Sequence, residues 1–300
     1  MERTESMRIF LRVAELTSFT KASDSLGIPK ATVSLAVQQL ENLTGTRLLH
    51  RTTRKVSLTQ DGLAWYERSR DLLADLEEME SMFKSGAELV GRLRVDMPSG
   101  LAKSVLMANL PEFLARHPRV QFELSSTDRK VDVIQEGFDC VVRVGFAADP
   151  GVMVRPLGRM SLINCASPAY LERYGTPLEL ADLAHHQLIH YSPVLGSKPG
   201  GFEYWDGSEY RSLQMTGSVT VNNSDAYRAA CLSGLGIIQV PRLGVNELLA
   251  SGDLREILPH LLAEPMPISL LYPQRRNLSR LVKAFLEWAA QLLQSQLDEG

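Results

Sequence analysis

The chain has 300 residues, of which 44% are hydrophobic and 22% are charged. This composition is that of a globular protein and excludes disordered, collagen-like and disulfide-scaffold classes. The length favours about two domains, each large enough to bury its own core. The net charge of −3 produces no protein-wide field that would attract nucleic acid or an acidic membrane.

The charge is nevertheless unevenly distributed along the chain. Residues 1–60 contain nine Lys and Arg against five Asp and Glu, a net charge of +4, so the remaining residues carry −7. A basic first fifth joined to an acidic remainder indicates that the two parts bind different kinds of partner.

The cysteines and the apolar segments indicate the cellular compartment of the protein. Three widely spaced cysteines (Cys140, Cys165 and Cys231) argue against a disulfide framework and a zinc site, and they fit a reducing compartment. The first residues lack the apolar segment of a signal peptide, and no run approaches the ~18 apolar residues that span a bilayer. We therefore expect a cytoplasmic protein with no membrane partner.

Apolar residues at helical spacing predict three helices near the N-terminus. The first covers about residues 5–16, and a short second helix follows Ser18, which can cap it. Gly27 supplies a turn, and Pro29 stands where a third helix, over about residues 30–42, can begin. Two helices joined by a short glycine-containing turn are typical of a helix-turn-helix.

The third helix and the segment after it carry the residue types that bind DNA. Hydroxyls and amides near a helix backbone can reach base edges in a groove, and a basic hairpin, or wing, over residues 48–58 can hold phosphates. A small structural bundle with a solvated basic hairpin is the alternative that the pattern leaves open. The DNA contacts that we expect are Ser18, Thr20, Lys30, Thr32, Ser34, Gln38, Arg51, Arg54 and Lys55.

Residues 5–62 also match one family's motif spacing without a gap. The matching run includes Phe10-Leu11-x-Val13-Ala14, Ser18-Phe19, Leu26-Gly27, Ala31-Thr32-Val33-Ser34, Val37-Gln38-Gln39-Leu40-Glu41, Arg51-Thr52 and Leu58-Thr59. It resembles the N-terminal module of LysR-type transcriptional regulators, which implies a winged helix-turn-helix with its motif near residues 19–38. Many members have Arg directly after the Ser of the recognition helix, but here the residue is Leu35. The operator sequence of the family is therefore not transferred to this chain.

A connecting helix follows Thr59, which can cap it. Trp65, Leu72, Leu76, Met79 and Phe83 form a heptad-type seam with Ser69 as its weak position. A dimerisation helix is favoured over a helix packed along its own domain, because two-fold symmetric proteins read two half-sites. The resemblance implies that such linker helices pair and that dimers assemble into tetramers.

The last two hundred residues alternate between strands and helices, which predicts an open α/β sheet with ligands beyond the carboxyl ends of its strands. We expect a helix at Val131–Ile134 and crossover strands near residues 162–166 and 265–271. The order resembles the family's effector-binding module, which is similar to two-lobed type 2 periplasmic binding proteins. The expected domains are 1–59 for DNA binding, 60–90 for the linker and 91–300 for the effector. The effector domain divides into lobe I, about 91–162 and 268–300, and lobe II, about 163–267.

Polar residues at strand ends and helix N-termini predict where an effector binds. Free N–H groups at a helix N-terminus favour an anion or a carboxylate. Simple capping is the alternative for each Ser or Thr, and Arg143 can pair with a ligand or equally with Asp128 or Asp139. The expected effector-binding residues are Ser99, Gly100, Ser126, Thr127, Arg143, Asn223 and Ser224.

Other chemistries find little support. His186 and His190 lie across a predicted strand, so we expect no metal site, and no cofactor motif or catalytic motif appears. The expectation is a regulator, not an enzyme, that binds double-stranded DNA and a small-molecule effector and forms a dimer or tetramer. RNA polymerase is a further possible partner. A solute-binding protein, or an α/β enzyme with an accessory DNA-binding domain, are the rival classes.

Overall fold

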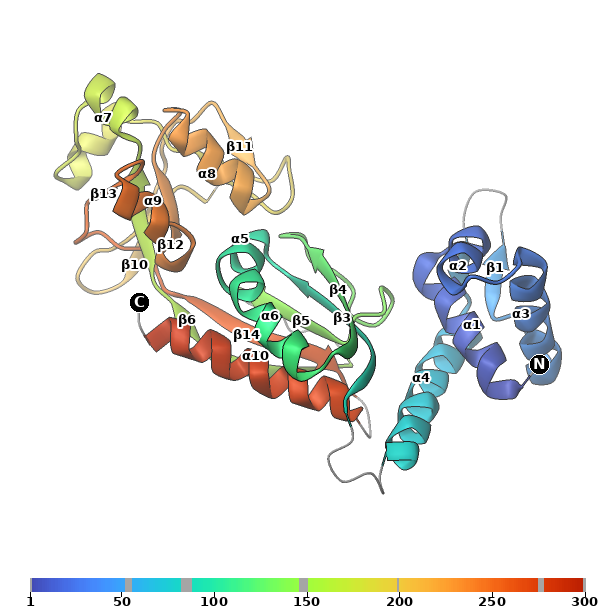
Figure 1. Ribbon diagram of the computed structural model, residues 1–300. Coiled ribbons are helices and arrows are strands. Elements are labelled where there is room, and N and C mark those ends of the chain that lie inside the picture. The colour runs from blue at the N-terminus through green and yellow to red at the C-terminus, as the bar shows by residue number, and fades with distance from the viewer. Residues whose placement is uncertain are drawn as a thin grey trace. The chain divides into compact units, whose positions relative to one another are not determined.

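The computed structural model of the protein describes residues 2–51, 56–81, 88–145, 151–198, 200–274 and 278–298. The chain divides into two units (Figure 1). The first comprises Met1–Leu89 with the segments Asp132–Gly137 and Pro273–Lys283, and the second comprises Val90–Val131, Phe138–Tyr272 and Ala284–Gly300.

The N-terminal unit is a winged helix-turn-helix, as the sequence predicts. Its helices are α1 (Arg3–Leu16), α2 (Phe19–Leu26), α3 (Lys30–Thr44) and α4 (Gln60–Ser81). The antiparallel strands β1 (Leu49–Arg51) and β2 (Val56–Leu58) form the base of the wing. The third helix extends two residues beyond the expected end, and Pro29 occupies its N-cap rather than its first turn.

Local chemistry explains the turn between α2 and α3. The Ser18 hydroxyl accepts a hydrogen bond from the Lys21 N–H and caps α2. Gly27 ends α2 with a φ of +66°, a left-handed conformation that suits glycine. The Ser23 hydroxyl then donates to the Ile28 carbonyl at 2.6 Å, which fixes the turn. Phe10, Val33 and Val37 are fully buried where α1 packs on α3.

The connecting helix α4 packs on its own unit through one face. Tyr66 and Leu73 belong to the helix-turn-helix core and Ser69 is also buried, while Leu72 and Met79 are 50% and 63% exposed. Ser69 is therefore not a weak position of an outward seam, because it belongs to the face that packs inward. Phe83, the expected end of the seam, lies outside the described residues.

The first lobe of the C-terminal unit is a five-stranded sheet in the order β4-β3-β5-β14-β6. Its strands are β3 (Val90–Met97), β4 (Arg119–Ser126), β5 (Cys140–Val144), β6 (Val152–Met160) and β14 (Met266–Pro273). Strand β3 is parallel to β4 and β5, and β14 is antiparallel to β5. The helical path after β3 is continuous, through α5 (Ser99–Leu101), a π-helical turn (Ala102–Leu106) and α6 (Met107–Arg116).

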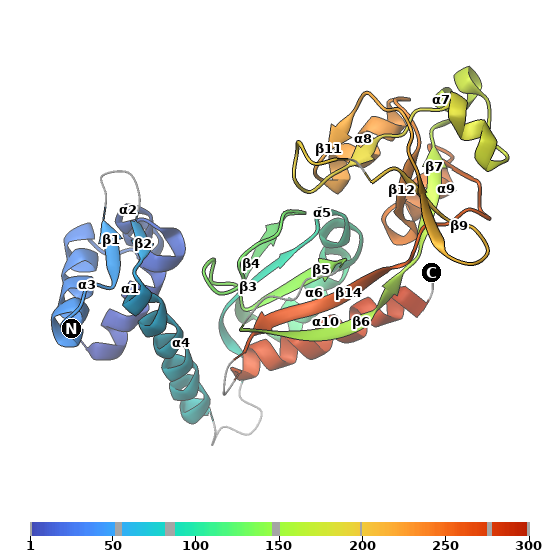
Figure 2. The same cartoon turned by 180° about the vertical axis from the view of Figure 1, so that it is seen from behind.

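Aromatic side chains hold the helices of this lobe to its sheet. The ring centre of Phe113 on α6 lies 5.7 Å from that of Phe285 and 4.9 Å from that of Trp288. Both of these residues are on α10 (Arg280–Asp298). Phe285 also lies 5.5 Å from Phe122 on β4. Helices α6 and α10 therefore share one face of the sheet, and Figure 2 shows α10 running along it near β6 and β14.

The second lobe is built on a three-stranded antiparallel sheet in the order β12-β7-β13. Its strands are β7 (Leu162–Ala166), β12 (Ile238–Pro241) and β13 (Arg255–Ile257), and its helices are α7 (Pro168–Tyr174), α8 (Ser224–Leu232) and α9 (Asn246–Ser251). Short 3₁₀ turns occur at Leu180–His185 and Arg242–Gly244. Two further pairs complete it: β8 (His190–Tyr191) with β11 (Thr220–Val221), and the hairpin β9 (Phe202–Trp205) with β10 (Tyr210–Leu213).

The two-lobed α/β fold is confirmed, with two local corrections. Strand β7 lies wholly in the second sheet and β14 wholly in the first, so the chain crosses between lobes at residues 161 and 258–265. Residues 133–137 form a turn rather than the expected helix. The Asp132 carboxylate accepts from the Ile134 and Gln135 N–H groups, a local alternative to helical hydrogen bonding.

Candidate functional site

Helix α3 has two distinct faces. Val33, Ala36, Val37 and Leu40 are buried in the core. Residues three or four apart share a helix face, so the positions opposite this stripe are Ala31, Leu35, Gln38 and Asn42. All four are exposed.

The predicted residues of α3 do not all lie together. Lys30, Ser34 and Gln38 follow one another at intervals of four and share a side, with Lys30 and Gln38 exposed and Ser34 half-buried. Thr32 is two positions from both Lys30 and Ser34 and therefore points elsewhere. Of the two predicted residues near α2, Ser18 acts as its cap, whereas Thr20 is exposed.

The wing residues are only partly described. Arg51 is the last residue of β1, and nothing is described of its side chain. Arg54 and Lys55 lie outside the described residues. The Glu41 carboxylate accepts from the Leu48 and Leu49 N–H groups at 3.0 and 3.2 Å, which ties α3 to the start of the wing.

An open hollow of about 800 Å³ lies beside the C-terminal half of α3. Gln38 and Asn42 line it from the helix, and Arg47 lines it from the segment that leads to β1. Ala31, Leu35, Asn42 and Arg47 were not among the predicted contacts. Helical periodicity counted from the buried residues could have found the first three.

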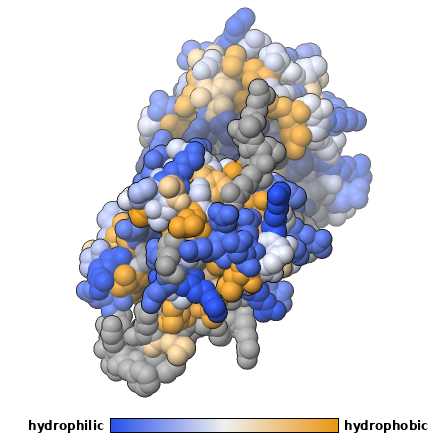
Figure 3. Space-filling model, turned by 90° about the vertical axis from the view of Figure 1, so that its right-hand side faces the viewer, coloured by the Kyte–Doolittle hydropathy of each residue, from blue (hydrophilic) through white to orange (hydrophobic). Residues whose placement is uncertain are grey.

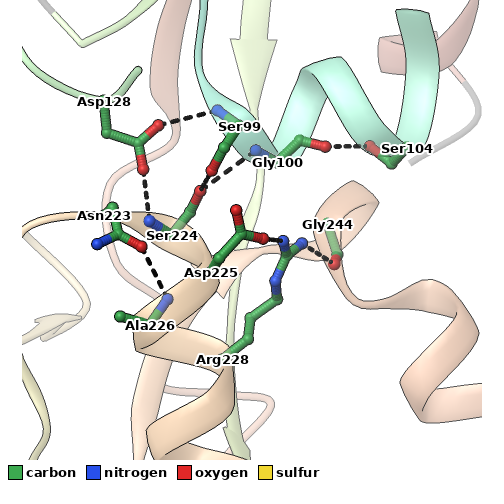
Figure 4. Close-up of polar contacts among 10 residues, drawn as sticks. All are labelled: Ser99, Gly100, Ser104, Asp128, Asn223, Ser224, Asp225, Ala226, Arg228 and Gly244. Atoms are coloured by element: carbon green, nitrogen blue, oxygen red, sulfur yellow. Dashed lines mark hydrogen bonds and ion pairs between the residues drawn. The ribbon is translucent and has the colours of Figure 1, made fainter. Parts of the chain in front are cut away.

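In the C-terminal unit, four predicted residues come together where the two lobes meet (Figure 4). Ser99 and Gly100 begin α5 in the first lobe, and Asn223 and Ser224 begin α8 in the second. The Ser99 and Ser224 hydroxyls lie 2.9 Å apart, and the Gly100 N–H donates to the Ser224 hydroxyl at 3.2 Å. Asn223 caps α8 by accepting from the Ala226 N–H at 2.8 Å. Two helix N-termini therefore converge from different lobes.

A carboxylate of the chain itself already lies between these N-termini. One Asp128 oxygen accepts from the Ser99 N–H at 3.1 Å, and the other accepts from the Ser224 N–H. Asp128 was considered only as a partner of Arg143. Its real partners include one that is 96 residues away, so no local pattern identifies them.

Charged and titratable groups surround this cluster. Burial, and then the adjacent Asp128 carboxylate, raise the pKa of Tyr191. Burial disfavours the charged form of Asp225, but hydrogen bonds from Ser99 and Arg228 outweigh it and lower the pKa of this carboxyl. Arg228 lies 2.5 Å from Asp225 and donates to the Gly244 carbonyl at 2.8 Å.

Two of the other predicted effector residues, Arg143 and Thr127, contact Asp96. The Arg143 guanidinium is 2.6 Å from the fully buried Asp96, which is neither of the two carboxylates considered. Thr127 also contacts Asp96, at 3.2 Å, and Ser126 is exposed at the end of β4. In this arrangement Arg143 neutralises a buried carboxylate.

The described residues offer no evident site for metal or thiol chemistry. Within the described residues no group of three or more His, Cys, Asp or Glu can hold a metal ion. His186 lies 3.1 Å from the Tyr170 hydroxyl instead. Burial raises the pKa of Cys165 and Cys231 to about 12, which leaves both thiols protonated and unreactive. Every helix in the described part of the chain is too short or too polar to cross a membrane.

Comparisons with known proteins agree with this architecture. Residues 4–63 match the family model of bacterial regulatory helix-turn-helix proteins of the lysR family, and residues 86–294 match the LysR substrate binding domain. An uncharacterized HTH-type transcriptional regulator of Escherichia coli (strain K12), YhjC, is 46% identical over 299 residues, covering 99% of this chain and 100% of its own length.

Two further proteins are similar over nearly the whole chain. An HTH-type transcriptional repressor of Pseudomonas aeruginosa (strain UCBPP-PA14) is 34% identical, covering 97% of this chain and 92% of its own length. The full-length structure of AphB, a Vibrio cholerae virulence activator, is 28% identical with a TM-score of 0.58 and covers 97% of this chain and 99% of its own. One of these relatives is named a repressor and the other an activator, so similarity does not assign the direction of regulation.

Proposed function

Because the chain belongs to the LysR family of bacterial transcriptional regulators, we propose that α3 reads the major groove of an operator while a small carboxylate, bound between the two C-terminal lobes, modulates that binding. The proposed domains are 1–59 for DNA binding, 60–90 for the linker and 91–300 for the effector. Homodimers or tetramers in the cytoplasm are the proposed working form, with RNA polymerase as a partner at the promoter.

The exposed polar side of α3 is the observation that carries the DNA-binding part of the proposal. Lys30, Gln38 and Asn42 are exposed on a helix whose other side is fully buried. Amide side chains can pair with adenine in the major groove, and cations hold the phosphates. Arg51, Arg54 and Lys55 extend the cationic contacts through the wing.

A mobility-shift titration with the DNA upstream of the protein's own coding region tests this part. We expect Gln38→Ala to weaken specific binding by about 1–3 kcal/mol, because it removes contacts to base edges. Gln60→Ala removes an equally exposed amide at the start of α4 and serves as the control. If the two variants bind alike, or if the wild type shifts no upstream fragment specifically, α3 is not the reading element.

The convergence of two helix N-termini supports a carboxylate effector. A helix N-terminus favours negative charge, since its first N–H groups lack partners within the helix. Asp128 satisfies one such N–H in each lobe. An effector carboxylate would make the same two hydrogen bonds after Asp128 has moved out, and Ser99, Gly100 and Ser224 would then surround it.

Asp128 is accordingly proposed as an internal competitor of the effector. The Asp128→Asn substitution keeps the shape of the side chain but removes the charge that would repel an incoming carboxylate. Losing one charge-assisted contact of the competitor should strengthen carboxylate binding at least about tenfold.

A thermal-shift screen of the full chain with small carboxylates and aromatic acids measures this effect. We expect acids that raise the melting temperature of the wild type to act at lower concentration on Asp128→Asn. Asp253→Asn, an exposed carboxylate of the second lobe that accepts from Ser251, should respond as the wild type does. Weaker binding by Asp128→Asn, or no response of either protein to any acid, would reject a carboxylate in this position.

A further inference from the structure

Leu35 occupies an unusual position on the helix that faces DNA. Its side chain is 52% exposed, and it lies in line with Ala31, Gln38 and Asn42, which are exposed too. The buried stripe of α3 lies on the opposite side. The middle of the reading face therefore carries a large apolar side chain beside polar ones.

Exposure alone would not make Leu35 notable. On the face of the molecule that Figure 3 presents, hydrophobic side chains form small separate patches among hydrophilic ones. Single exposed hydrophobic residues are ordinary on protein surfaces. What distinguishes Leu35 is its place in the N-terminal half of α3, because the N-terminal residues of a recognition helix contact base edges.

The chemistry of the major groove limits what a leucine can recognise there. Each base edge presents hydrogen-bond donors and acceptors, and the C5-methyl group of thymine is the apolar feature. A leucine has no group that can donate or accept. Against guanine or cytosine it would displace water from polar atoms without replacing their hydrogen bonds, which is unfavourable.

We propose that Leu35 reads the C5-methyl group of a thymine in each operator half-site. This inference rests on the proposed docking of α3 in the major groove and adds to it the base that one residue selects. Contact with thymine buries apolar surface on both sides, whereas the other bases meet Leu35 with polar edges. Removing one methyl group from such a contact should weaken binding about fourfold per half-site.

The test uses the full-length protein and a duplex selected by the wild type from a randomised pool. Each thymine of that duplex is replaced in turn by deoxyuridine, which lacks only the methyl group. We expect one thymine per half-site whose replacement by deoxyuridine raises the Kd of the wild type about fourfold. The Leu35→Ala protein should bind the thymine and deoxyuridine duplexes equally well at that position.

Leu43 offers a matched control on the same helix. It is also 52% exposed, but it follows the buried Leu40 by three positions and so lies at the edge of the packed face. The Leu43→Ala protein should keep the full preference for thymine over deoxyuridine. Leu35→Met retains a long apolar side chain, so this protein should keep most of the preference for thymine over deoxyuridine.

A methyl group placed on cytosine provides an independent measurement. With the sensitive T·A pair changed to C·G, 5-methylcytosine should bind the wild type more tightly than cytosine does, and Leu35→Ala should not distinguish the two. The proposal is overturned if no thymine is sensitive to loss of its methyl group, or if Leu35→Ala retains that sensitivity. Failure to enrich any duplex would instead overturn the docking of α3 itself, and this inference with it.

Discussion

Gly62 leaves no room for a side chain where the wing meets α4. A Cβ atom at this position would lie 1.9 Å from the Leu48 carbonyl oxygen. That carbonyl accepts from the Thr59 N–H at 3.0 Å, so the backbone cannot retreat without breaking the junction of wing and α4. We expect Gly62→Ala to destabilise this unit by about 2 kcal/mol or more, because overpacking against the backbone forces the chain to shift.

Hydrogen exchange of the α1 and α3 amides, measured in the full chain, reports the stability of this unit locally. Gly200→Ala is the control, since a Cβ there would meet nothing within 4 Å and no positive φ constrains the residue. Unchanged protection of α1 and α3 in Gly62→Ala would mean that the junction is looser than its geometry indicates.

Individual residues of the site also show what a sequence can and cannot reveal. Ser99 and Ser224 were predicted because helix N-termini have local signatures of small polar residues. The intramolecular partners considered for Arg143 were wrong: its carboxylate is Asp96, and Asp128 accepts from the Ser99 and Ser224 N–H groups instead. These pairings depend on packing between distant segments. A local pattern states which groups need a partner, and only the fold decides which partner each one has.

At the scale of the element, α4 has two exposed apolar residues, seven positions apart, beside the face that packs on its own unit. Leu72 and Met79 are 50% and 63% exposed, which is unfavourable for side chains of this size unless another surface covers them. We expect the double substitution Leu72→Glu and Met79→Glu to lower the oligomeric state, because two charges would have to be buried at the pairing surface. Sedimentation of the full chain measures it.

Leu43→Glu places the same charge at a comparably exposed leucine on α3 and should leave the sedimentation coefficient unchanged. An unaltered assembly in the double variant would exclude these two residues as the contact between copies. Periodicity predicted α4 correctly, but its packed and its exposed apolar residues have nearly the same spacing. The sequence could not distinguish the residues that pack within the unit from those that are left exposed, and for this reason Ser69 was assigned to the wrong face.

At the scale of the whole molecule, the order of strands and helices was the most predictable feature. Alternation and turn residues indicated an open α/β sheet and a helix-turn-helix followed by a hairpin, since these signals repeat along the chain. The division into two lobes was implied by the family resemblance. The sequence pattern does not identify strands β6, β9, β10 and β13, which are largely exposed or short. Their burial pattern has little regular alternation, so hydrophobic periodicity had nothing to detect.

The stability of the whole chain should depend on pH through two histidines of the second lobe. Burial lowers the pKa of His186 and His190 below the ordinary value of 6.5. The Tyr170 hydroxyl accepts from the Gln187 N–H at 2.8 Å and can donate to Nδ1 of His186, an arrangement that suits a neutral imidazole. The unfolded chain therefore binds protons more readily than the folded chain as the solution becomes acidic.

It follows that the free energy of unfolding is highest above pH 6.5 and falls as the pH drops from there towards the lower pKa values of the folded state. Urea unfolding at a series of pH values measures the slope. Replacing both residues by Gln should flatten the curve below pH 6.5, because neither replacement can take up a proton. His260→Gln changes an exposed histidine of the same lobe and should leave the slope as it is. If the free energy of unfolding of the double variant still falls at acid pH, the loss of stability is due to carboxylates instead.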